Sequence, residues 1–81
     1  MNMRRIRYCH KRNRGVWGLA FPDEWRIELD PGLDDKTLLD IAIHESTHVI
    51  APDLDEQTVD RLGRHAADLL WRLGYRRAGD E

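Results

Sequence analysis

The chain has 81 residues, and its composition excludes several classes of protein. A chain of this length supports one domain with one modest hydrophobic core. The single cysteine, Cys9, excludes an internal disulfide, and no apolar run is long enough for a transmembrane helix or a signal peptide. We therefore expect a soluble protein of the reducing cytoplasm, with no membrane partner.

The formal net charge of −2 is unevenly distributed. Residues 1–16 carry six bases and no acid, whereas residues 22–60 carry twelve acids and only two bases. The acidic middle favours a divalent cation nearby. The basic start is expected to form the solvated face of a hairpin, with nucleic-acid binding by residues 1–16 as the alternative. The opposite charges of the two parts would also permit a homodimer.

Three strands are expected in the first 30 residues. Residues 3–10 and 16–21 read as strands joined by a hairpin, because Asn13 and Gly15 both tolerate a positive φ. Within the second strand, Gly18 indicates a bulge or a close backbone approach. Residues 25–30 alternate apolar and charged side chains, as in a half-buried strand.

Two helices follow. Asp34 or Asp35 is expected to cap a helix over residues 35–50, which Ala51-Pro52 ends. Asp53 and Glu56 then match a capping box at the start of a second helix over 55–74. Its expected apolar stripe is Val59, Leu62, Ala66, Leu69, Leu70 and Leu73. With residues 76–81 as a tail, the prediction is one α+β domain: a small antiparallel three-stranded sheet followed by two antiparallel helices.

The helix predicted at 35–50 contains the sequence His44-Glu45-Ser46-Thr47-His48. Residues four apart project from one helical face, so the two imidazoles supply half of a tetrahedral zinc site. Glu45 between them is not a ligand and is placed to take a proton from an activated water. The alternative is a core helix with two hydrogen-bonded histidines.

A catalytic zinc site needs a third protein ligand. The candidates are Asp53, Asp55, Glu56, Asp60, His65 and the distant His10. At 100° per residue, Glu56 lies at the edge of the apolar stripe, whereas His65 points to solvent. Gly63 and Ala67 lie on the Glu56 edge, where small residues allow the two helices to approach closely. Glu56 is therefore favoured as ligand, with helix capping as its alternative role.

His44-Glu45-x-x-His48 followed by Glu56-x-x-x-Asp60 on a second helix resembles the zincin superfamily, in its glutamate-zincin branch. The chain is similar to minimal glutamate-zincins and to very short phage-type metallopeptidases. The resemblance implies a zincin-like core and one Zn²⁺ per chain, bound by His44, His48 and Glu56. It also implies catalysis by Glu45 and orientation of His44 by Asp60 from outside the ligand set. The gap of seven residues between His48 and Glu56 is shorter than in large members of the branch.

The sequence thus favours a zinc-dependent metallopeptidase that hydrolyses peptide or protein substrates. An exposed edge of residues 16–21 or 25–29 could pair with an extended peptide, and Trp17 could line the groove. Tyr8, Tyr75 and His10 are the candidates for stabilising an oxyanion. The alternative is a non-catalytic, zinc-stabilised regulatory or inhibitor module on the same fold, and a nucleic-acid-binding protein ranks third.

Overall fold

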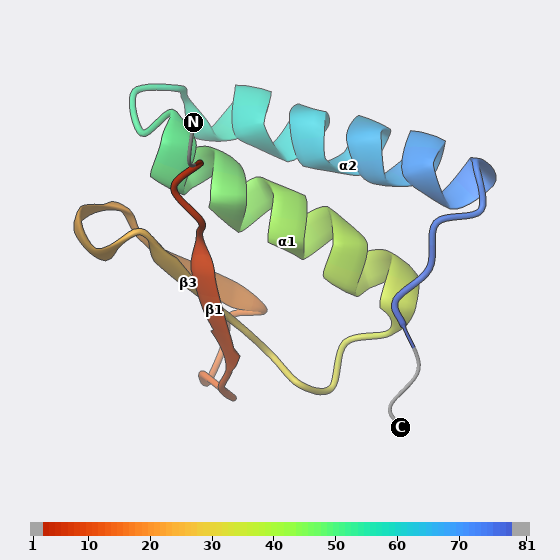
Figure 1. Cartoon of the computed structure of the whole chain (residues 1–81), viewed down its shortest axis with the longest axis horizontal. Coiled ribbons are helices and arrows are strands. Elements are labelled where there is room, and N and C mark those ends of the chain that lie inside the picture. The colour runs from red at the N-terminus through yellow and green to blue at the C-terminus, as the bar shows by residue number, and fades with distance from the viewer. Residues whose placement is uncertain (1–2, 79–81) are drawn as a thin grey trace.

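A computed structural model describes residues 3–78 as a three-stranded sheet covered on one face by two stacked helices (Figure 1). The strands are β1 (Arg7–His10), β2 (Gly18–Phe21) and β3 (Arg26–Leu29), with a short 3₁₀ helix, η1 (Pro22–Glu24), before β3. Helix α1 (Asp35–Ile50) packs on β2 and β3, and α2 (Glu56–Arg72) packs antiparallel on α1. The predicted α+β class, with a sheet followed by two helices, is confirmed.

The predicted antiparallel sheet is wrong in its pairing, because the sheet is mixed. Its strand order is β1-β3-β2, with β1 parallel and β2 antiparallel to β3. β3 lies between β1 and β2, the two strands that were predicted to pair as a hairpin. Of that hairpin, the structure contains a single bridge between Asn13 and Val16. The most deeply buried strand thereby takes the central position, where both of its edges are paired.

The strand predicted at 25–30 is one residue shorter at each end and is buried on both faces. Trp25 closes η1 in the left-handed conformation, with φ of 50°. Ile27 and Leu29 enter the core as the alternation predicts. Glu28, predicted to face solvent, is only 6% exposed, and it accepts hydrogen bonds from Arg26 Nη1 at 2.9 Å and Asn13 Nδ2 at 3.0 Å. These bonds hold the pKa of the Glu28 carboxyl below its usual range.

Helix α1 has the predicted bounds, and Asp34 caps it by accepting a hydrogen bond from the Thr37 backbone N–H at 2.8 Å. The capping box predicted for α2 is wrong. Asp55 is the cap and accepts from the Thr58 N–H at 2.7 Å, whereas Asp53 is exposed and caps nothing. Glu56 is therefore the first residue of the helix, and its side chain takes no part in capping.

The face that α2 turns toward α1 also differs from the predicted stripe. The buried residues are Val59, Gly63 and Ala67. Leu62, Leu69 and Leu73 are 41–65% exposed. The small residues set the packing face because they let the helix axes approach closely, which the leucines would prevent.

Within residues 3–78, neither helix is both long and apolar enough to cross a lipid bilayer. The chain leaves α2 through Gly74, whose φ of 96° turns it back toward the sheet. Of the tail predicted at 76–81, residues 76–78 have no regular secondary structure, and residues 79–81 lie outside the described part of the chain.

Candidate metal centre

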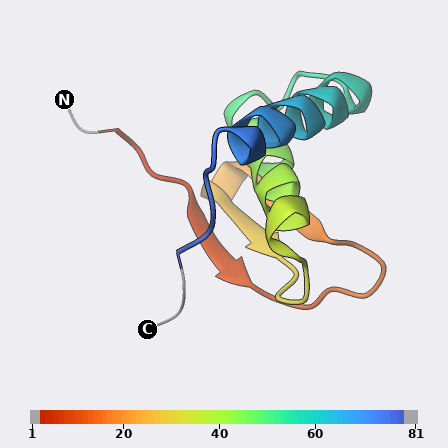
Figure 2. The same ribbon diagram turned by 90° about the vertical axis from the view of Figure 1, so that its right-hand side faces the viewer.

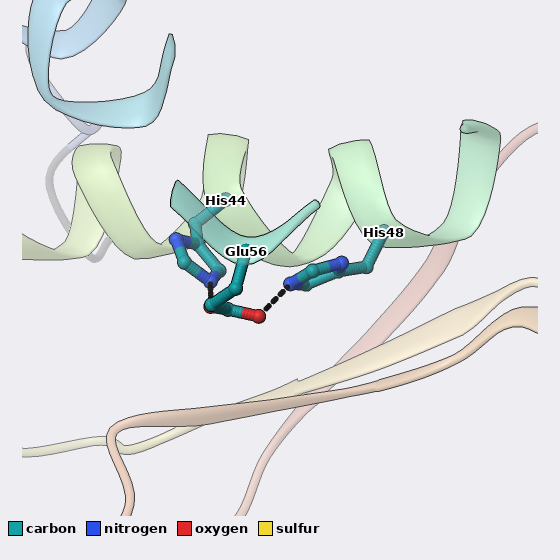
Figure 3. Close-up of side chains that lie close together, drawn as sticks. All are labelled: His44, His48 and Glu56. Carbon is teal, nitrogen blue, oxygen red and sulfur yellow. Dashed lines mark ion pairs between the residues drawn. The ribbon is translucent and has the colours of Figure 1, made fainter. Parts of the chain in front are cut away.

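Three side chains from the two helices converge at one point. His44 and His48 project from α1, and Glu56 reaches them from the first position of α2 (Figure 3). The Nε2 atom of His44 lies 2.8 Å from Glu56 Oε1, and the Nε2 atom of His48 lies 3.0 Å from Glu56 Oε2. One donor atom from each residue lies within 4.8 Å of the others, which is compatible with binding to a common metal ion.

The local sequence explains this convergence. The four-residue spacing places both imidazoles on one face of α1, with ring centroids 4.9 Å apart. A short turn follows, in which the Ala51 N–H donates to Thr47 O and the Leu54 N–H donates to Ala51 O. Because Asp55 then starts α2, Glu56 lies directly over the last turns of α1.

Gly63 allows the two helices to be this close. A Cβ at this position would lie 2.8 Å from Asp40 Oδ1 and 3.4 Å from His44 Cβ. The Asp40 side chain can turn away, but the Cβ would also lie 3.1 Å from the Asp40 carbonyl oxygen, so an alanine would require the two helices to separate by a few tenths of an ångström. The small edge of α2 predicted from the sequence is therefore confirmed.

The cluster is partly shielded from water. The side chains of His44 and His48 are 13% and 22% exposed, whereas that of Glu56 is 71% exposed. Two imidazole nitrogens and one carboxylate are the donor set of many three-ligand zinc sites, in which a fourth position is left for water or substrate. The same contacts also describe a hydrogen-bonded histidine–glutamate cluster, so the geometry permits a metal without requiring one.

Glu45 lies between the two histidines in sequence and is buried, at 9% exposed. Burial raises the pKa of its carboxyl above the usual value, and positive charge on the histidines opposes this shift. The backbone of β2 passes close by, since a Cβ on Gly18 would lie 3.0 Å from Glu45 Cγ. The close approach predicted at Gly18 is confirmed.

Glu45 and His44 border a cleft of about 420 Å³ between β2, α1 and α2. Trp17, 59% exposed, lines its sheet side and is therefore not a core residue. β2 is an outer strand, so its free edge faces no other strand among residues 3–78. The alternative edge at 25–29 is ruled out because β3 is central.

Asp60 and Asp40 border the same cleft. The Asp60 carboxylate forms an ion pair with Arg64 at 3.0 Å, and no hydrogen bond joins it to His44 among the described residues. Its role in orienting His44 stays a prediction. Asp40 was missed in the sequence, although it lies one helical turn before His44. Burial raises the pKa of the Asp40 carboxyl, and the negative charge of Asp60 adds to the effect.

The other candidate ligands lie elsewhere. Asp55 caps α2, Asp53 is exposed, and His65 lies on the outer surface of α2. His10 is on β1, with its ring edge-on to Tyr8 at 6.0 Å. His10, Tyr8 and Tyr75 line a separate groove and do not border the cleft, which removes them as candidates for stabilising an oxyanion there.

Comparisons of the chain with protein-family models, with characterised proteins and with solved structures found no significant match. The function therefore has to be inferred from the residues of the site.

Proposed function

We propose that this chain is a zinc-dependent peptidase in which His44, His48 and Glu56 hold the metal and Glu45 acts as general base. The observation that carries the proposal is the position of the Glu56 carboxylate, which reaches both imidazoles from a different helix. A second acid, Glu45, lies beside them at the border of a cleft. The donor set and its partial burial fit zinc.

When bound, zinc lowers the pKa of water and polarises a substrate carbonyl. Glu45 accepts the water proton and passes it to the leaving amine. The position of Glu45 suits it to both steps, because it lies between the two histidines in sequence and borders the cleft. The free edge of β2 would hold an extended peptide by backbone pairing, and Trp17 would pack against its side chains.

A second candidate is a non-catalytic, zinc-stabilised regulatory or inhibitor module. The observation that favours it is the shortage of donors for an oxyanion. Among the described residues that border the cleft, Trp17 and Arg64 carry side-chain donors outside the metal cluster, and Arg64 is paired with Asp60. This module would bind zinc through the same three residues and would hydrolyse nothing.

Two measurements on four proteins test both candidates. Zinc content and affinity are measured for the wild type and for Glu56→Ala, Glu45→Gln and His65→Ala. The wild type, Glu45→Gln and the control His65→Ala are expected to bind one zinc per chain. Glu56→Ala is expected to bind zinc more weakly, by at least the roughly 10–100-fold that loss of an outer-sphere partner causes.

Hydrolysis of a mixture of fluorogenic peptides is then measured with zinc present. Glu45→Gln is expected to lower the rate by roughly 10²–10⁴-fold, because it removes the general base and keeps the metal. Zinc binding without turnover in the wild type would favour the regulatory module. Equal zinc affinity in Glu56→Ala and the wild type would remove Glu56 from the ligand set and contradict both candidates.

A further inference from the structure

A second depression lies on the other side of α1 from the cleft, and it shares no lining residue with the cleft. It is a groove of about 510 Å³ between β1, α1 and the C-terminal part of α2. Its walls are mainly apolar and include Ile6, Tyr8, Leu38, Leu39, Leu70 and Trp71. The groove exists because α1 covers β2 and β3 and leaves the helix-facing side of β1 open. In Figure 2, β1 and the segment that follows α2 both lie to the left of α1.

The backbone of β1 is also open along one edge. β1 is an outer strand of the sheet, with no strand beyond it among residues 3–78. Its inner side pairs with β3, since Arg7 N–H donates to Trp25 O at 3.0 Å and Lys11 N–H donates to Leu29 O at 2.9 Å. In a parallel pair, backbone groups of alternate residues point to opposite sides of the strand. The N–H and C=O groups of Tyr8 and His10 therefore face the free edge.

The side chains of these two residues point toward the groove. Tyr8 and His10 pair with Ile27 and Leu29 of β3, whose side chains enter the core beneath α1. Residues directly opposite each other in a sheet share a face. A strand added to the β1 edge would therefore place every second side chain at the groove, next to Tyr8, which is 69% exposed.

The charges around the groove are mainly positive. The segment that contains β1 has six bases and no acid, and the charged residues that line the groove itself are Arg76, Arg77 and Asp35. Arg76 is held in place by stacking on Trp71 at 3.4 Å and by donating to two backbone carbonyls. Pairing of two copies of the chain along β1 would bring two such basic segments together, which disfavours self-association at this edge. An acidic occupant is the complementary choice.

We propose that the β1 edge and its groove form a docking site for an extended, acidic segment of a partner protein. The backbone of the segment pairs with Tyr8 and His10, and its apolar side chains enter the groove. Its carboxylates lie on the opposite face of the added strand, beside Arg7, which alternates with Tyr8 along β1. The site is independent of the metal centre, so docking persists in EDTA and in Glu56→Ala, whatever the outcome for zinc and hydrolysis.

The test uses the full chain and a fluorescein-labelled octapeptide in which valine alternates with glutamate or aspartate. Fluorescence anisotropy is expected to show saturable binding, and a peptide with lysine in place of each acid is expected to bind at least about tenfold more weakly. N-methylation of alternate peptide nitrogens removes the pairing donors and is expected to abolish binding. Arg7→Glu and Tyr8→Ala are each expected to weaken binding about fivefold or more. Arg61→Glu, the same charge reversal on the outer surface of α2, leaves binding unchanged.

Hydrogen exchange locates the contact, because peptide binding is expected to slow exchange at the amides of Tyr8 and His10. Absence of binding at roughly 1 mM peptide overturns the proposal. The proposal is also overturned if the N-methylated peptide or the lysine peptide binds as tightly as the acidic peptide. Dodecanoate, an oligonucleotide and the chain itself are tested as other occupants. Binding of any of these at Tyr8 in place of the acidic peptide contradicts the assignment.

Discussion

The carboxylate of Glu56 can reach α1 because its neighbour Asp55 takes the role of helix cap. At the first position of α2, a negative side chain is also favoured by the partial positive charge of the helix N-terminus. With Asp53 as the cap, Glu56 would be the third residue of the helix, and its carboxylate would turn back to the N–H of the cap as in a capping box. The position of the third donor therefore depends on a local choice between two aspartates.

Gly63 gives a prediction at the scale of one residue. In an exposed helix interior, Gly→Ala stabilises by about 1 kcal/mol. Here the added Cβ would lie 2.8 Å from Asp40 Oδ1 and 3.1 Å from the Asp40 carbonyl oxygen, and such overpacking typically costs 1–3 kcal/mol. We therefore expect Gly63→Ala to lower the urea midpoint of unfolding and to weaken zinc binding by moving Glu56 away from α1.

The control for this substitution is Gln57→Ala, at an exposed position on the same helix. It is expected to leave zinc affinity unchanged and to change stability little. A higher unfolding midpoint for Gly63→Ala than for the wild type would show that the two helices separate without cost, contrary to the packing described.

At the scale of the element, α2 is positioned by small residues and not by its leucines. Gly63 and Ala67 are buried against α1, and this leaves Leu62, Leu69 and Leu73 on the outer surface. The helix is amphipathic, but the side on which it packs was decided by how closely the axes can approach. This orientation of α2 about its own axis also brings Glu56 to the two histidines.

The cap of this helix gives a prediction on pH. The hydrogen bond from the Thr58 N–H holds the pKa of the Asp55 carboxyl below its unfolded value of about 3.9. A depressed carboxyl pKa stabilises the folded chain above the unfolded pKa, and this stabilisation is lost as the pH falls through the folded pKa. Asp55→Ala is therefore expected to lower stability at pH 7, and its difference from the wild type should diminish below about pH 4.

Urea unfolding between pH 3 and pH 8 measures this dependence. Asp53→Ala is the matched control, because Asp53 was predicted as the cap and is exposed without capping. It should follow the wild type at every pH. Equal losses from the two substitutions at pH 7 would mean that Asp55 does not determine where α2 begins.

At the scale of the molecule, the buried core is small. Its apolar members are Ile27, Leu29, Val49, Val59 and Ala67. A single core in a chain of about this size supplies only about 3–5 kcal/mol, so a bound metal that joins the two helices would add substantially to stability. Glu56 and the histidines connect α2 to α1, whose Val49 packs in one cluster with Ile27 and Leu29 of β3.

Zinc is therefore expected to raise the unfolding temperature. At a free concentration 100 times the Kd, a ligand that binds only the folded state contributes about 2.7 kcal/mol. For a domain of this size, that corresponds to an increase of roughly 10–20 °C. Differential scanning calorimetry with zinc and with EDTA measures the change. Glu45→Gln and His65→Ala should show the same increase, whereas Glu56→Ala should show much less. An identical unfolding temperature in zinc and EDTA would contradict the expected binding.

The sequence by itself predicted the features that depend on near neighbours. The bounds of α1 follow from Asp34 and Pro52, and the shared face of His44 and His48 follows from their spacing. Helical periodicity places Glu56 on the same side of α2 as the small residues that allow α1 to approach, so Glu56 was expected to face α1. The convergence of these three side chains could therefore be expected before the fold was known, although a bound metal and hydrolysis remain predictions.

The tertiary structure decided which elements lie side by side. Alternation in a strand gives its two faces and not its neighbours, so the insertion of β3 between β1 and β2 and the burial of Glu28 could not be predicted. Strand order depends on contacts between residues far apart in sequence. The open side of β1 has the same cause, because it follows from where α1 lies on the sheet, which no local pattern of residues specifies.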